Sequence, residues 1–351
     1  MSHSRPGRNL SRPIGIGAIG ALLFLMLWGV LSGSQIREGF VQDDPEQTDV
    51  ALYKAISARV ADGDGYYDAV AVEQVRRGFP TSPAVTVREP TLAWLTSAVG
   101  PPAAYGVLLA LAGIALVLSM YCLDQLSATR VEWVTGTVIA AVTIANLCPP
   151  LNVWIHDVWA GLLILIAGLT STRRWFWPTL LALLAACLVR ELALPAALAM
   201  AAVAWPRLSR RRRALSVAAL LAFLAFYGWH VAQVERMVPP GSQPSPGWLD
   251  VNGWPFFVNA TWFSTVLTNG PVILAALLVP VALLGWVAHE SPRTRPVAVV
   301  LVVYAVVFSV IGRDNNLYWG ALFGPLLLPG IAFAPRAVWR LARASRGPTR
   351  V

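Results

Sequence analysis

Charged residues and cysteines are both scarce in this chain. Asp, Glu, Lys and Arg make up only 13% of its 351 residues, and hydrophobic residues make up 56%, whereas about a quarter of a typical soluble domain is charged. This composition argues against a purely soluble fold. Cys122, Cys148 and Cys187 lie in apolar stretches without CxxC spacing. We therefore predict small buried side chains, and neither a disulfide framework nor a zinc site.

Lysine is nearly absent. Lys54 is the only lysine among 27 basic residues, a bias that we interpret as the preference of a GC-rich bacterial genome. The formal net charge is +9, but the basic residues stand in short clusters between apolar runs instead of gathering on one face. This distribution favours a role in membrane topology over nucleic-acid binding.

Long apolar runs make up most of the sequence outside the charged clusters. In a helix, about 20 apolar residues cross the ~30 Å hydrocarbon core of a bilayer. The runs are continuous and do not alternate as barrel strands do, so they predict an all-α polytopic transmembrane bundle. We expect about ten spans, at residues 14–31, 103–123, 131–148, 154–170, 175–189, 192–205, 214–232, 271–288, 297–311 and 317–334.

The charge between these runs predicts their orientation. With both termini in the cytoplasm, the cytoplasmic segments hold 18 basic and three acidic residues, and the outward segments hold nine basic and 15 acidic residues. Positive charge on the cytoplasmic side is the usual arrangement in multi-pass proteins. We therefore predict a bacterial inner-membrane protein with a cytoplasmic tail, a transmembrane domain containing two external loops, and a basic cytoplasmic tail. These parts comprise residues 1–13, 14–335 with loops 33–97 and 233–270, and 336–351.

Two segments leave alternatives open. Residues 175–205 are interrupted by Arg190 and Glu191, so they form either one long buried helix or two short helices, and only two helices keep the arginine-rich loop 207–213 in the cytoplasm. The first apolar run also resembles a secretory signal. Its length and the lack of a small-residue cleavage site favour a retained helix.

Ionisable groups on the predicted outer side are the candidate functional residues, because such groups are costly at a membrane. Arg88, Arg190 and Arg313 each stand next to a carboxylate. They either bind phosphate oxygens through the guanidinium fork or anchor helix ends. Tyr66 and Tyr67 either line a sugar site or belong to an interfacial aromatic belt. His156 and Asp157 either do acid–base work or cap a helix.

Three outward segments carry a family resemblance. Asp49 is followed four positions later by Tyr53 and by an amphipathic pattern of Leu52, Ile56 and Val60. Arg88, Pro90 and Leu92 precede the second span, with Glu89 and Thr91 departing from the family pattern, and Arg313 and Tyr318 precede Pro325 in the last span. These segments resemble the corresponding parts of GT-C membrane glycosyltransferases.

That resemblance implies transfer of a sugar from a polyprenyl-phosphate carrier to a lipopolysaccharide, an exopolysaccharide or another glycan or lipid acceptor. Such a reaction needs a base for the acceptor proton and cations for the leaving phosphate, and a single displacement inverts the product. Asp49 is the preferred base, with Asp43 and Asp44 as rivals. No cofactor is required, and a divalent metal is permitted without being demanded. The donor would contact Arg88, Arg190, Arg313 and Tyr53, and the substrate cavity would include Tyr66, Tyr67, His156, Asp157, Glu191 and Tyr318.

Two other classes of protein remain open. A flippase for lipid-linked sugars needs ionisable residues along a path through the bilayer and often inverted repeats, whereas the charges here gather on one face. A non-catalytic assembly protein with a GT-C-like fold would share the whole pattern.

Overall fold

The computed structural model of the protein describes residues 12–32, 48–171, 175–238, 244–245 and 247–346, and most of these residues are helical. Two isolated bridges, Ser82 with Pro244 and Leu249 with Ile311, are the β-type pairings in that part of the chain. The α-helices are α1 (Arg12–Ser32), α2 (Asp49–Ala61), α3 (Tyr66–Arg76), α4 (Thr91–Val99), α5 (Pro101–Leu126), α6 (Arg130–Ala145), α7 (His156–Ser171), α8 (Phe176–Val189), α9 (Leu194–Ala204), α10 (Arg210–Met237), α11 (Gly253–Ser264), α12 (Val272–Val287), α13 (Arg295–Val310), α14 (Gly324–Leu327) and α15 (Ala334–Arg346). Short 3-10 helices connect several of them: η2 (Ala84–Thr86), η3 (Pro150–Trp154), η4 (Glu191–Ala193), η5 (Trp205–Arg207), η6 (Val266–Asn269), η7 (Pro292–Thr294), η8 (Asp314–Leu322) and η9 (Leu328–Phe333).

Several of these helices are long and apolar enough to cross a bilayer. Four qualify by themselves, namely α1, α5, α10 and the segment Pro292–Val310, and the bent pair of residues 315–322 and 324–346 would make a fifth. This is the make-up of a helical membrane protein. Helices α7, α8 and α12 are apolar but shorter. The count of ten spans stays a prediction.

Residues 175–205 form two helices, α8 and α9, which is the alternative that the sequence favoured. Helix α8 ends at Val189, Arg190 is extended with φ −155°, and α9 begins at Leu194 with Pro195 in its first turn. Proline fits a first turn because the amide that it lacks would have no helical partner there. The start of α8 and the end of α9 line one common cavity, so the chain reverses direction at Arg190.

The last apolar run, expected as one span over residues 317–334, is not a single continuous helix. It consists of η8, α14 and η9, and the chain bends by 47° between residues 322 and 324. Pro325 and Pro329 interrupt the helical hydrogen bonds. Gly320 and Gly330 pack so closely on the backbones of Ala260 and Ala282 that any side chain would collide with them.

Most of residues 336–351, predicted to be a basic cytoplasmic tail, belong to helix α15, which packs against α1 and α12. Ala334, Ala337 and Leu341 form its buried stripe. Arg340 pairs with Glu290 across 2.7 Å. Spacing of three to four residues puts these apolar side chains on one helix face, which explains why a basic segment is ordered here.

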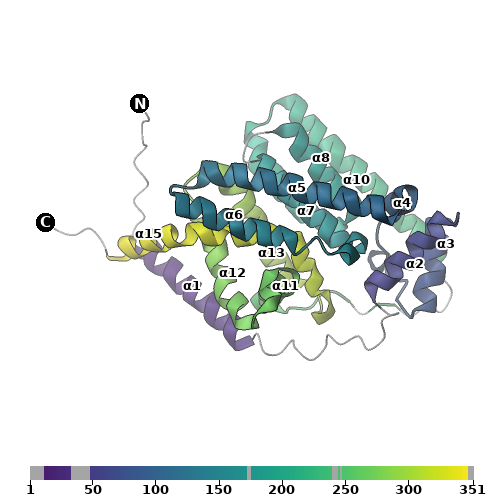
Figure 1. The fold of residues 1–351 in the computed structure, drawn as a ribbon, viewed down its shortest axis with the longest axis horizontal. Helices are drawn as coiled ribbons and strands as arrows, with labels where there is room; N and C mark the ends of the chain where they lie inside the picture. Colours follow the sequence, from purple (N-terminus) through teal and green to yellow (C-terminus); the bar gives the residue numbers. More distant parts are fainter. Residues whose placement is uncertain (1–11, 33–47, 172–174, 239–243, 246, 347–351) are drawn as a thin grey trace.

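Helix α7 lies in the middle of the bundle and contacts α5, α8 and η8. Almost all of its residues are buried. Figure 1 shows α2, α3 and α4 at one end of the molecule and α15, beside the start of α1, at the other. The candidate site lies where α2 and the chain before α4 meet the starts of α7 and η8 and the turn after α8.

The segment predicted to be the first external loop contains the expected amphipathic helix as α2. Leu52 and Ile56 are buried and Val60 packs at the edge of the same cluster, together with Val70 of α3 and Val234 of α10. This small apolar cluster is what holds α2 and α3 against the transmembrane bundle.

Candidate functional site

A buried ion cluster is the most distinctive polar feature of the described chain. Arg190 Nε donates to Asp157 Oδ1 at 3.0 Å, and Arg190 Nη1 donates to Glu191 Oε1 at 2.9 Å. Arg190 and Asp157 are each only 1% exposed. A guanidinium taken out of water is stable only with charged partners, and the two carboxylates supply that requirement.

Local structure explains how these residues meet. Asp157 lies in the first turn of α7, where a negative charge interacts favourably with the exposed amides of the helix. Arg190 lies at the turn after α8, and α7 and α8 are packed side by side. The antiparallel pairing of these two helices therefore brings the start of one beside the end of the other.

Arg88 joins three segments that are far apart in the sequence. Its Nη2 donates to the Tyr318 hydroxyl at 2.9 Å, and its guanidinium carbon lies 6.0 Å from the centre of the Tyr53 ring. The Tyr66 hydroxyl donates to the main-chain carbonyl of Arg88 at 2.6 Å, which fixes the backbone at this point. No hydrogen-bond partner within the described chain accepts from the buried Nε of Arg88.

Glu89 completes the cluster, and sequence reasoning missed it. Its side chain is fully buried, and no N–H or O–H group of the described residues donates to either of its oxygens. Its carboxyl meets that of Glu191, and such a pair forms a hydrogen bond only when one of the two groups is protonated. The sequence signal was its place between Arg88 and Pro90, which we interpreted only as a departure from the family motif.

Electrostatics assign the proton of this pair to Glu89. Burial, followed by the charge of Glu191, raises the pKa of Glu89 well above its usual range. Burial would also raise the pKa of Glu191, but Arg190 and Arg88 outweigh it and lower that pKa below its usual range. Of the two carboxyl groups, Glu191 is therefore the one that more readily carries the negative charge beside Arg190.

Tyr53 and His156 pack against each other beside the ion cluster. Their rings meet edge to face with centres 4.8 Å apart. Burial raises the pKa of the Tyr53 hydroxyl well above 10, and the Asp49 carboxylate, one helical turn earlier, raises it further against the opposing effect of Arg88. The cavity beside these rings measures about 10 Å³, room for about one water molecule.

The remaining predicted site residues lie at varied distances from this cluster. Asp49 begins α2, where Thr48 caps the helix. The Tyr67 hydroxyl bonds to His230 Nδ1 at 3.0 Å, on the side toward α10. Arg313 instead faces Trp248, with its guanidinium carbon 4.8 Å from the ring centre. Asp43 and Asp44 lie outside the described residues.

Trp319 is a further neighbour that the sequence did not single out. The guanidinium carbon of Arg190 lies 5.8 Å from its ring centre, within the range of a cation–π contact. Among the described residues, no group of three or more His, Cys, Asp or Glu side chains is arranged to hold a metal ion. Glu89, Asp157 and Glu191 lie instead around guanidinium groups.

Comparison of the chain with protein-family models, curated protein sequences and solved structures found no match. Its function must therefore be argued from its own residues.

Proposed function

We propose that the protein is a GT-C-type membrane glycosyltransferase. It transfers a sugar from a polyprenyl-phosphate carrier to a cell-surface glycan or lipid acceptor at the outer face of a bacterial plasma membrane. One observation supports this proposal most directly. Arg88 contacts both Tyr53 and Tyr318, so residues from the three segments that carry the family resemblance meet at one point, one helical turn from Asp49.

The chemistry of these groups fits an inverting displacement. Asp49 takes the proton from the acceptor hydroxyl, whose oxygen then bonds to the anomeric carbon of the donor. The bond between that carbon and the carrier phosphate oxygen breaks, and the electron pair leaves with the phosphate. Arg88 stabilises the departing phosphate, since a guanidinium stays charged in a nonpolar environment. Arg190 is already bound to two carboxylates, so its role is structural: it keeps Asp157 and Glu191 in place beneath the site.

The proposed topology has ten spans, with both termini in the cytoplasm and the site outside. The separation of α2, α3 and α4 from α15 at opposite ends of the molecule supports it (Figure 1). Arg336, Arg340, Arg343 and Arg346 all belong to α15, and clustered arginines favour the cytoplasmic side. The narrow cavity beside Tyr53 implies that α2 moves away from α7 when substrate binds.

The experiment is replacement of Asp49 in cells that make the surface glycan. We expect Asp49→Asn to abolish glycan modification, and the unused lipid-linked donor to accumulate, at unchanged protein abundance in the membrane. Asp62→Asn is the matched control, because Asp62 is an exposed carboxylate at the other end of α2. Surface glycan composition and extracted lipid-linked sugars are the two measurements.

Three outcomes separate the alternatives. Normal glycan in Asp49→Asn would remove Asp49 as the base, and repeating the test with Asp44→Asn and Arg88→Lys would then decide whether the protein is an enzyme at all. Loss of lipid-linked sugar movement in sealed vesicles, with transfer intact in opened vesicles, would identify a flippase. Normal glycan in all three variants would contradict the glycosyltransferase proposal.

A further inference from the structure

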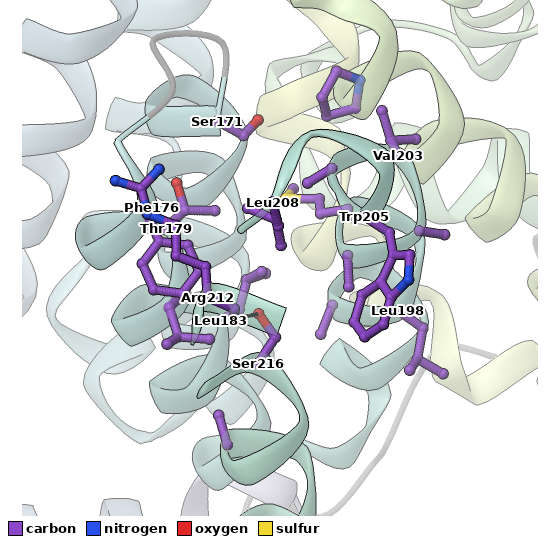
Figure 2. Close-up of a pocket in the computed structure, with 18 of the residues that line it drawn as sticks. Ser171, Phe176, Thr179, Leu183, Leu198, Val203, Trp205, Leu208, Arg212 and Ser216 are labelled. Atoms are coloured by element: carbon purple, nitrogen blue, oxygen red, sulfur yellow. Dashed lines mark hydrogen bonds between the residues drawn. The ribbon is translucent and has the colours of Figure 1, made fainter. Parts of the chain in front are cut away.

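A large apolar groove lies between α8, α9 and α10, with one mouth at the end of α8 that is remote from the ion cluster. Its volume is about 850 Å³, toward the upper end of the ~300–1,000 Å³ that is typical of ligand sites in proteins. Figure 2 shows Phe176 and Leu183 of α8 facing Leu198 and Trp205 across it. Leu220 and Phe223 of α10 complete the lining. Nothing in the glycosyltransferase proposal uses this space.

One mouth of the groove is basic. Arg207, Arg212 and Arg293 all line it, and the guanidinium carbon of Arg212 lies 5.3 Å from the ring centre of Phe176. Arg207 donates to a main-chain carbonyl of α9, and Arg293 donates to the side-chain oxygen of Gln125. Within the described residues, no carboxylate pairs with any of these three arginines. The mouth therefore presents positive charge that no carboxylate of the described residues neutralises.

The depth of the groove matches one leaflet of a bilayer. It extends along α8 from Phe176 to Cys187, which is about 16 Å at 1.5 Å per residue. That is roughly half of the ~30 Å hydrocarbon core. An apolar slot one leaflet deep, with cations at its open end, is complementary in shape and charge to a phospholipid whose headgroup lies beside those cations.

The position of the mouth argues against the sugar carrier as occupant. Phe176 begins α8 and Arg190 follows its end, so a phosphate at the mouth would lie about 20 Å from the ion cluster. A carrier phosphate held there would be out of reach of Asp49 and Arg88. A phosphate bound at the basic mouth therefore belongs to a different molecule from the donor of the proposed reaction.

We propose that this groove is a binding site for an anionic phospholipid, with its acyl chains along α8, α9 and α10 and its phosphate at Arg207, Arg212 and Arg293. The site is independent of the proposed enzymatic activity. Bound lipid fills the space between the α8–α9 hairpin and α10, so it stabilises the packing of α10, which has few buried residues of its own.

Native mass spectrometry of the full-length protein in detergent micelles tests the headgroup site. Phosphatidylglycerol and phosphatidylcholine with identical acyl chains are the two probes. We expect phosphatidylglycerol to be retained preferentially. Arg207→Gln with Arg212→Gln should weaken its binding by about five-fold per arginine and leave phosphatidylcholine unaffected. Arg211→Gln is the matched control, because Arg211 belongs to the same turn of α10 but does not line the groove.

A second variant tests the acyl-chain site. Ala201 lines the groove and Ala218 of α10 does not, so Ala201→Phe should displace bound lipid while Ala218→Phe should retain it. Two outcomes would contradict the proposed lipid site. One is equal retention of the two lipids by the wild type, and the other is unchanged retention in both the double arginine variant and Ala201→Phe. Preferential retention of a polyprenyl phosphate over phosphatidylglycerol would overturn the assigned occupant.

Discussion

Helices α7 and α10 are both apolar, yet they occupy opposite environments. Nearly every residue of α7 is buried in protein, whereas of the 28 residues of α10 only Phe223, His230 and Val234 are buried. Lipid tails are as apolar as leucine, so hydropathy places a helix in the membrane without deciding its depth in the bundle. The depth of a helix in the bundle depends instead on two features. These are small residues that permit close backbone contact and polar groups that need partners. Helix α7 has both, in Gly161 and Asp157.

The sharpest test of this difference is removal of one arginine near each helix. Arg190→Met should destabilise the fold by about 3–5 kcal/mol, because it leaves Asp157 of α7 buried without its cation. Arg211→Met, on the exposed first turn of α10 and outside the lining of the groove, should change stability by no more than about 0.5 kcal/mol. Denaturant titration in mixed micelles measures both changes.

The control for that experiment removes both members of the ion pair, Arg190 and Asp157. Arg190→Met combined with Asp157→Leu should recover part of the lost stability, because the orphaned carboxylate is gone. Equal losses in Arg190→Met and Arg211→Met would show that the ion cluster of α7 contributes no more than a surface charge.

A glycine in each helix gives a second, smaller contrast. A side chain at Gly161 would collide with the main-chain carbonyl of Ala321, whereas nothing lies within 4 Å of the corresponding position at Gly228 of α10. Gly161→Ala should therefore cost about 1–3 kcal/mol through overpacking, and Gly228→Ala should gain up to about 1 kcal/mol from helix propensity. Thermal unfolding followed by circular dichroism is the measurement, and a gain in both variants would contradict the close contact of α7 with η8.

The buried carboxyl of Glu89 predicts a pH effect, the smallest of the three. Its pKa is raised in the fold above the usual 4.5, so folding favours the protonated form. The stabilising contribution is present below about pH 4.5 and is lost as the pH rises toward the folded pKa. The Glu89→Gln side chain is neutral at every pH. We expect the unfolding temperature of the wild type to fall more steeply above pH 5 than that of Glu89→Gln.

Glu235→Gln, on the exposed face of α10, controls for the change in net charge in that experiment. Parallel pH profiles for the wild type and Glu89→Gln would contradict the protonated Glu89 of the ion cluster.

The sequence predicted the positions of most helices to within a few residues. Apolar runs at 14–31, 103–123 and 214–232 became α1, α5 and α10, because the length of a continuous apolar run is set directly by the thickness of the bilayer. The run at 317–334 was the exception. Gly320 and Gly330 in this run make close contacts with the backbones of α11 and α12, and no local pattern encodes those partners.

The candidate site was predictable in part. Arg88, Arg190, His156, Asp157 and Glu191 were singled out as ionisable residues in apolar surroundings, and they lie together. Arg313 was chosen on the same grounds and faces Trp248, because a prediction that residues share one side of a membrane does not predict which of them are in contact. The catalytic role of Asp49 stays a prediction.

By itself, the sequence determined that this chain enters a membrane as helices and where most of those helices begin and end, since both follow from run length and hydropathy. Only the tertiary structure decided that α7 is enclosed and α10 exposed, that Glu89 meets Glu191, and that the α8–α9 hairpin leaves a groove against α10. Each of these depends on which distant backbones approach closely, and that is a property of packing between segments that no single segment contains.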